Sequence, residues 1–157
     1  MQRILPPILV LVIFVLMVVV ATVAPGPILL ERPWPLVGVV PLVAGVSLTL
    51  AGSRRFSRVG TNIKTFDDPD VLVDSGLFGF SRNPMYLGFV MTLVGVALLT
   101  GALTPWIGPI TFAVAAHQWY IAFEEQRMAA VFGPTYERYR ARVPRWFGAP
   151  RRLEPSR

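Results

Sequence analysis

Cysteine is absent from this 157-residue chain, and histidine occurs once, as His117. The lack of cysteine excludes a disulfide framework, thiolate metal sites and a cysteine nucleophile. A single histidine excludes a metal site built from several imidazoles, so we expect no metal. Charge is also scarce, because 15% of the residues are charged while 54% are hydrophobic. Soluble domains have about 25% charged residues, so this composition argues against a soluble protein and excludes intrinsic disorder.

The charge that is present is mostly basic, with 15 Lys and Arg against 9 Asp and Glu and a net charge of +6. A chain that is both basic and apolar favours anionic lipid headgroups over nucleic acid as its partner. At this length we expect a single domain over residues 1–157. We therefore predict an all-α integral membrane helical bundle.

The first half of the chain contains two apolar runs of membrane-spanning length. A bilayer core about 30 Å thick requires about 20 residues of helix, and residues 4–23 form one such run. A secretory signal is the alternative, but its apolar core is usually about 7–15 residues long. Pro33 and Pro35 suit the start of a second span over residues 35–52. Small residues in this span suit close packing against a neighbouring helix: Gly38, Ala44, Gly45, Ser47 and Gly52.

Residues 83–123 contain no charged side chain and are too many for one span. Glycine often ends a helix and proline often begins the next, so we place a turn between Gly101 and Pro105. The segment then forms two spans, over about 85–101 and 105–123. The prediction is four transmembrane helices in total.

Fourteen of the 15 basic residues fall on one side of a four-span protein. They lie at the N-terminus, in the loop 53–84 and in the tail 124–157. The positive-inside rule makes this side cytoplasmic, and we expect a bacterial inner membrane. In the tail, Tyr136, Tyr139 and Val143 share one stripe beside several arginines. This pattern predicts a C-terminal interfacial amphipathic helix that binds anionic lipids.

Arg82, Asn83 and Pro84 lie where the middle loop meets the third span. The simplest interpretation is an ordinary helix start, with Asn83 as the N-cap, Pro84 in the first turn and Arg82 at the lipid headgroups. The alternative is a ligand site, because free N–H groups at a helix N-terminus beside an arginine favour a carboxylate or phosphate.

Glu124 and Glu125 follow the fourth predicted span. The simplest interpretation is a solvated pair at the membrane surface. The alternative is a site for a cationic or hydroxyl-bearing ligand, because two acids at the end of a helix oppose its dipole. His117 lies about two turns earlier on the same predicted face. A polar residue inside a span is a candidate site residue, and a structural hydrogen bond to a backbone carbonyl is the alternative.

These residues are more specific in combination than any one of them is alone. The stretch Leu72-Val73-x-x-Gly76-Leu77-Phe78-x-x-x-Arg82-Asn83-Pro84-x-Tyr86-x-Gly88 resembles a signature of the isoprenylcysteine carboxyl methyltransferase family, which is related to membrane phospholipid N-methyltransferases. The run from Glu124-Glu125 through Phe132-Gly133-x-x-Tyr136 to Val143-Pro144-Arg145-Trp146 resembles its second signature, and Gly60-Thr61 fits bacterial members. The chain departs from the eukaryotic members at Asp70, Asp74, Phe78, Asn83 and Tyr120, so the acceptor stays open.

The resemblance implies S-adenosylmethionine-dependent methyl transfer at the cytoplasmic membrane surface. It implies a cofactor pocket with one wall from the first signature: Leu72, Val73, Gly76, Leu77, Arg82, Asn83, Pro84 and Tyr86. Glu124 and Glu125 would close the other side, and His117 would also contact the cofactor. We predict His117 and Arg82 as the catalytic residues, with His117 either deprotonating the acceptor or orienting the cofactor.

The expected acceptor is lipophilic: an isoprenylcysteine-like carboxylate or thiol, or a lipid amine. We expect it to reach the site from the bilayer between the second and third helices. An NADPH-dependent membrane reductase with a sterol-reductase-like fold is one alternative, but it would need more basic phosphate ligands. A non-enzymatic membrane scaffold is the other, and it would not need Arg82, His117 and the Glu pair to converge.

Overall fold

The computed structural model of the chain describes residues 4–59 and 71–151. Its described part is all α-helical, and its only β pairing is an isolated bridge between Ile28 and Ala102. The elements, in order, are α1 (Pro6–Val23), a 3-10 turn (Trp34–Gly38), α2 (Val39–Val59), a 3-10 turn (Gly76–Gly79), α3 (Pro84–Thr100), a 3-10 turn (Thr104–Trp106), α4 (Ile107–Ala115), a π-helical turn (Ala116–Tyr120), α5 (Ile121–Phe132) and α6 (Pro134–Arg142). The predicted fold class is confirmed at this level.

Proline and glycine set the main helix boundaries, as the sequence suggests. Pro84 and Pro134 occupy the first turns of α3 and α6, where a missing N–H costs nothing. α3 ends at Gly101, whose φ of 67° is left-handed, so the predicted turn between Gly101 and Pro105 is confirmed. That turn is tied to the α1–α2 connection, because Leu29 N–H donates to the Gly101 carbonyl at 2.7 Å.

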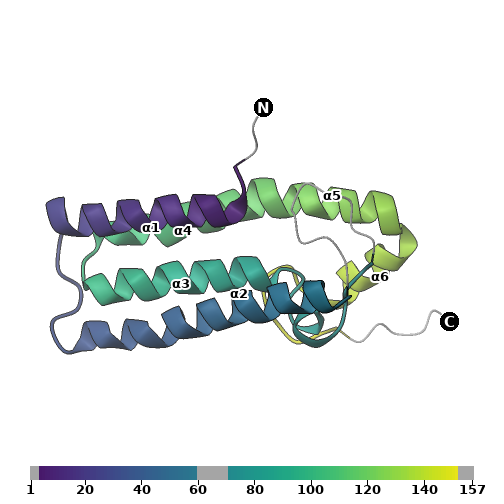
Figure 1. Cartoon of the computed structure of the whole chain (residues 1–157), viewed down its shortest axis with the longest axis horizontal. Coiled ribbons are helices and arrows are strands. Elements are labelled where there is room, and N and C mark those ends of the chain that lie inside the picture. The colour runs from purple at the N-terminus through teal and green to yellow at the C-terminus, as the bar shows by residue number, and fades with distance from the viewer. Residues whose placement is uncertain (1–3, 60–70, 152–157) are drawn as a thin grey trace.

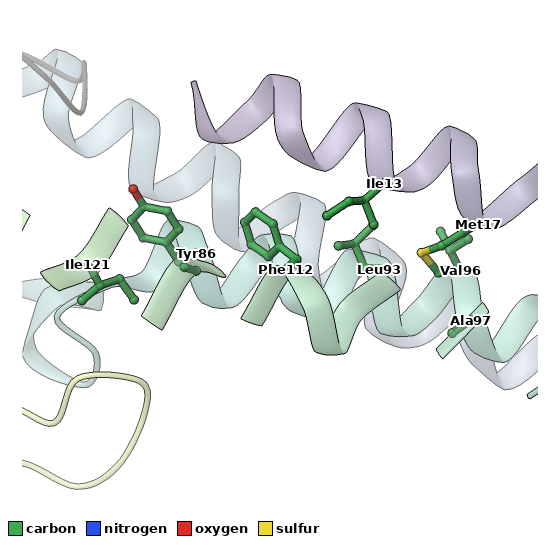
Figure 2. Packing of buried hydrophobic residues seen from close by; sticks show 9 residues of the cluster. Ile13, Met17, Tyr86, Leu93, Val96, Ala97, Phe112 and Ile121 are labelled. Carbon is green, nitrogen blue, oxygen red and sulfur yellow. The ribbon is translucent and has the colours of Figure 1, made fainter. Parts of the chain in front are cut away.

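The helices are arranged as two long layers (Figure 1). One layer contains α1 beside α4, and α4 continues through the π-helical turn into α5; the other contains α2 and α3. An apolar core joins the layers, and its side chains interdigitate between α1, α3 and α4 (Figure 2). Leu93 of α3 and Phe112 of α4 are fully buried there, and Ile13 and Met17 of α1 cover them.

Among the described residues, two segments are long and apolar enough to cross a membrane: α1 and the stretch Trp34–Arg55. α3 is also apolar but has only 17 residues. The four-span count therefore stays a prediction. Two helices end later than the predicted spans. α2 runs to Val59, and the helix after Pro105 continues past Phe123 to Phe132.

α2 and α3 pack backbone against backbone. Glycines recur every seven residues on the side that meets α3: Gly38 in the 3-10 turn before α2, and Gly45 and Gly52 on α2. A Cβ atom placed on Gly45 would lie 2.5 Å from the Gly88 carbonyl oxygen, so a larger residue does not fit without a shift. The prediction that small residues allow close packing here is confirmed for Gly38, Gly45 and Gly52, whereas Ala44 and Ser47 are exposed. Our expectation that a lipid reaches the site between these two helices stays a prediction, and the backbone contact along this seam argues against it.

Candidate functional site

An ion-paired cluster lies at the end of the bundle where α5, α6 and the start of α3 meet. Its centre is the carboxylate of Glu125, which is only 8% exposed. Arg82 Nη1 lies 2.9 Å from Glu125 Oε1. Arg145 binds the same carboxylate through two nitrogens: Nε donates to Oε1 at 3.0 Å, and Nη2 donates to Oε2. We call Arg82, Glu125 and Arg145 the ion-paired cluster.

The burial of this cluster has an electrostatic cost that only its pairing can offset. Removing a charge from water costs several kcal/mol, and the attraction of a well-placed opposite charge repays it. Glu125 meets this condition through the two-pronged contact with Arg145, which is the strongest geometry for such a pair. Two cations against one anion leave the cluster with a formal surplus of one positive charge. The Arg82 side chain is 9% exposed, and its Nε–H has no hydrogen-bond partner among the described residues.

The position of Arg82 corrects part of the sequence interpretation. We considered that its guanidinium lies at the lipid headgroups as an anchor. Instead it is buried, paired with Glu125, and donates to the Tyr136 hydroxyl at 3.3 Å. The carboxylate of Glu125 offsets the cost of burying this guanidinium, because the attraction between opposite charges is larger where water is excluded.

The segment that follows α6 crosses over the start of α3. We call residues 143–148 the C-terminal strap. Arg82 N–H donates to the Pro144 carbonyl at 3.0 Å, and Gly148 N–H donates to the Phe80 carbonyl at 3.2 Å. The side-chain amide of Asn83 donates to the Arg145 carbonyl at 3.0 Å. These bonds place the side chains of Arg145 and Trp146 directly over the site.

Asn83 is the N-cap residue of α3, but its side chain forms no capping hydrogen bond. The role we expected for it is therefore only half right: the helix starts there, but the side chain holds the C-terminal strap. Consequently the first turn of α3 has no side-chain cap for its N–H groups, which is the condition for an anion site at a helix N-terminus.

A π-helical turn brings His117 and Glu125 to the same side of the helix. In a regular α-helix, residues seven apart share a face, which is why we expected His117 to align with Glu124. A π turn accommodates one extra residue, so His117 instead aligns with Glu125. Arg145 bridges the two: its Nη1 lies 3.2 Å from His117 Nε2, and its other nitrogens bind Glu125.

Our dipole argument for the two glutamates is also wrong in its premise. Glu124 and Glu125 lie near the beginning of α5, not at the end of a helix, because the helix continues to Phe132. Glu124 accepts a hydrogen bond from the buried Tyr86 hydroxyl at 2.7 Å. Tyr86 also stacks on Tyr120, with ring centroids 6.2 Å apart.

A second cluster, which is apolar, packs between α6 and the loop before α3, next to the ion-paired cluster. Tyr136, Tyr139 and Val143 are buried against Val73 and Phe78. The stripe that we assigned to a lipid-facing amphipathic helix is therefore inside the protein, because the loop before α3 covers it. The Tyr139 hydroxyl donates to the Phe78 carbonyl at 2.8 Å. Burial raises the pKa of Tyr139 well above its usual value, and it also raises the pKa of Tyr136, with the Glu125 charge adding to that effect.

The structure brings together some of the predicted site residues and not others. Arg82, Asn83, His117 and Glu125 belong to one connected network, and Tyr86 joins Glu124 beside it. Pro84 is fully buried in the first turn of α3. The remaining predicted residues lie apart from this network: Leu72 and Val73 pack in the apolar cluster, while Gly76 and Leu77 are exposed. Gly60, Thr61 and Asp70 lie outside the described residues.

Sequence reasoning missed Arg145, Trp146 and Tyr136 as site residues. The Trp146 indole donates to His117 Nδ1 at 3.2 Å, and the two rings are nearly parallel, with centroids 6.4 Å apart. Arg145 and Trp146 belong to the second signature, so their positions in the motif were the available signal. Nothing in the spacing indicated that the chain folds back over α3.

A helical bundle with two motif-bearing segments meeting at a buried Arg–Glu–Arg cluster is consistent with a membrane enzyme. Comparison with known proteins assigns the family. The chain belongs to the phospholipid methyltransferase family, whose model matches residues 33–135. The matched region includes α2, α3, α4 and α5 and ends at the start of α6.

Two relatives show how far the similarity extends. The chain is 27% identical over 101 residues to the protein-S-isoprenylcysteine O-methyltransferase of Schizosaccharomyces pombe. That match covers 62% of this chain and 41% of the length of the yeast protein. It is 37% identical over 62 residues to an uncharacterised protein of Haemophilus influenzae, covering 40% of this chain and 98% of that relative. No solved structure matches the chain.

Proposed function

We propose that this protein is an S-adenosylmethionine-dependent methyltransferase that acts on a lipophilic acceptor at the cytoplasmic surface of a bacterial inner membrane. The observation that carries the proposal is the meeting of the two signature segments. Arg82 from the first and Glu125 and Arg145 from the second share one buried ion-paired cluster. A structural scaffold would not need to bury two charged groups, Arg82 and Glu125, beneath the half-buried Arg145 at such an electrostatic cost.

The residues present fit the polar groups of this cofactor. S-adenosylmethionine has a carboxylate, and the unpartnered Nε–H of Arg82 lies beside the uncapped first turn of α3. Both features favour an anion. Glu125 is occupied by two arginines, so we assign it the role of holding them in place. We assign Glu124, next to Tyr86, to the amino or ribose hydroxyl groups of the cofactor.

When bound, the cofactor supplies an electrophilic methyl group on a sulfonium. The contribution of the protein is then mainly proximity and orientation, because a displacement at carbon depends on alignment of the reacting atoms. The close packing of α2 on α3 supports an approach of the acceptor from another side of the bundle. The acceptor is proposed as an isoprenylcysteine-like carboxylate or thiol, or a lipid amine.

Calorimetry on the full chain in detergent tests the cofactor assignment. We expect S-adenosylhomocysteine to bind and NADPH not to bind. Binding of NADPH instead would indicate a reductase, and binding of neither would leave a scaffold. Mass spectrometry of a lipid extract incubated with labelled S-adenosylmethionine then identifies the acceptor.

Arg82→Lys tests the anion site more directly. Lysine keeps the charge but loses the fork that matches a carboxylate, so we expect S-adenosylhomocysteine to bind severalfold more weakly, the equivalent of about 1 kcal/mol. Arg138→Lys is the matched control, because Arg138 is exposed on α6 and contacts only Thr135 among the described residues. Equal affinity for Arg82→Lys and the wild type would remove Arg82 from the cofactor site.

The proposed orientation has both termini and the site in the cytoplasm. It depends on the four-span count and the distribution of arginines. A C-terminal reporter that is active only in the periplasm should be silent in this protein. An active reporter would overturn the orientation.

A further inference from the structure

His117 is approached by two hydrogen-bond donors, one at each ring nitrogen. Arg145 Nη1 lies 3.2 Å from Nε2, and the Trp146 indole nitrogen lies 3.2 Å from Nδ1. A guanidinium and an indole can only donate hydrogen bonds. Both donors come from the C-terminal strap, and the imidazole comes from the π-helical turn.

The protonation state of the ring therefore decides whether His117 can accept a hydrogen bond from Arg145 or Trp146. A neutral imidazole has one lone pair, so it accepts from one of the two donors at a time. A protonated imidazole has none, so each of its N–H groups would face another N–H, and its positive charge would lie next to Arg145. The contact exists only while His117 is neutral.

The charged groups around the ring are already paired with one another. Among the described residues, the strap supplies Arg145 and α5 supplies Glu125, which Arg145 already neutralises. The loop before α3 supplies Arg82, which shares that same carboxylate. The titratable neighbour in the same turn is Tyr120, whose hydroxyl instead donates to the Ile4 carbonyl at 2.9 Å. No described anion faces the ring directly to stabilise its protonated form.

We propose that His117 is a positioning residue: its neutral ring holds the C-terminal strap over the site and so keeps Arg145 on Glu125. Protonation of the ring removes this one hydrogen bond, so the strap is held less firmly over the site as the pH falls, while its bonds to Arg82, Asn83 and Phe80 remain. This inference rests on the proposed function in one respect, which is that the site binds S-adenosylmethionine. It assigns His117 an acceptor role instead of the proton abstraction that the sequence suggested.

Two substitutions mimic the two states of the ring. His117→Gln retains an acceptor oxygen that does not titrate, and His117→Lys adds a permanent positive charge. Gln118→Lys is the matched control, because it places the same charge on the next residue of the same turn, where the side chain is exposed. The probe ligand is S-adenosylhomocysteine, and the pH range is about 5 to 8, in which histidine side chains change charge.

For the wild type we expect the affinity to fall by about fivefold from pH 8 to pH 5, the equivalent of one lost hydrogen bond of about 1 kcal/mol. His117→Gln should show a nearly flat profile at the high-pH affinity. His117→Lys should bind about fivefold more weakly at every pH, and Gln118→Lys should follow the wild type. A flat wild-type profile, or a His117→Lys variant that binds like the wild type, would overturn the proposal.

Tryptophan fluorescence provides a second measurement that does not depend on the ligand. The difference between the wild type and Trp146→Phe isolates the indole that stacks on His117. We expect this difference signal to titrate between pH 5 and 8 and to stop titrating in His117→Gln. If S-adenosylhomocysteine binds no variant, the proposed function fails, and this signal alone decides on His117. A titration that persists in His117→Gln would overturn the positioning role.

Discussion

Two of the interfaces that α3 makes have opposite chemistry, and the contrast between them separates the scaffold of this protein from its site. Towards α2, glycines on both helices bring the backbones into contact over several turns. Towards α5, the contacts are polar: the Tyr86 hydroxyl binds Glu124, and Arg82, just before the helix, binds Glu125. The first interface leaves no room for a ligand or for adjustment. The second concentrates charge where the chain bears its family motifs.

The two interfaces also differ in how they are stabilised. Close backbone packing is a sum of many small dispersion contacts, each worth only a fraction of a kcal/mol. The ion-paired cluster depends on a few charges whose separation would be individually costly. Single substitutions should therefore have their largest effects in the cluster, intermediate effects in the glycine seam and the smallest effects at exposed ion pairs.

The largest effect is expected from Glu125→Gln. The substitution leaves Arg82 and Arg145 close together without an anion between them, and breaking a buried pair in this way typically costs about 3–5 kcal/mol. We expect this loss in the free energy of unfolding, measured by denaturant titration in detergent. Glu137→Gln is the control, because Glu137 forms an exposed pair with Arg140. Equal stability of Glu125→Gln and the wild type would mean that the cluster does not stabilise the fold.

Most of this architecture, but not the cluster, is readable from the sequence. The turn at Gly101 and the close packing of Gly38, Gly45 and Gly52 follow from glycine and proline chemistry, which acts locally. The first apolar run, 4–23, matches α1 within two residues at its start. Local rules succeed here because each depends on residues close together in the chain.

The errors arise where a distant segment decides the outcome. The stripe of Tyr136, Tyr139 and Val143 has the pattern of a surface helix, and periodicity does not tell whether lipid or protein covers it. The pairing of Arg82 with Glu125, and of Arg145 with both Glu125 and His117, requires the strap to fold back over α3. The π-helical turn that aligns His117 with Glu125 has no sequence signal that we recognise.

An intermediate effect is expected from Gly45→Val in the glycine seam. A Cβ at this position would meet the Gly88 carbonyl oxygen and the Thr92 N–H at 2.5 Å, and both are backbone atoms that cannot rotate away. Overpacking of this kind costs about 1–3 kcal/mol. Ala44→Val is the matched control, because Ala44 is the preceding residue and is exposed. If both variants melt at the same temperature, α2 and α3 are not in backbone contact.

A smaller effect, with a defined pH dependence, is expected from Tyr139→Phe. At neutral pH the loss of the hydrogen bond to the Phe78 carbonyl should cost about 1 kcal/mol. Burial raises the pKa of Tyr139 in the folded state, so its neutral form contributes stability below the ordinary tyrosine value of about 10 and loses it as the pH rises further.

The melting temperature of the wild type should therefore fall more steeply above pH 10 than that of Tyr139→Phe. Tyr136, whose pKa burial also raises, accounts for the slope that persists in the variant. Identical slopes in the two proteins would contradict the assignment to Tyr139.

The smallest effect is expected from Asp74→Asn, which breaks an ion pair of similar length to that of Arg82 and Glu125. Arg142 Nη2 lies 2.9 Å from Asp74 Oδ2, but the two side chains are 44% and 48% exposed. Water and salt screen such a pair, and exposed pairs contribute about 0–1 kcal/mol. A double-mutant cycle with Arg142→Gln, measured at low and at high salt, isolates the pair from its neighbours. We expect a coupling below about 0.5 kcal/mol that vanishes in high salt. A coupling as large as the loss in Glu125→Gln would show that burial does not distinguish the two pairs, and the contrast between the ion-paired cluster and the surface would fail.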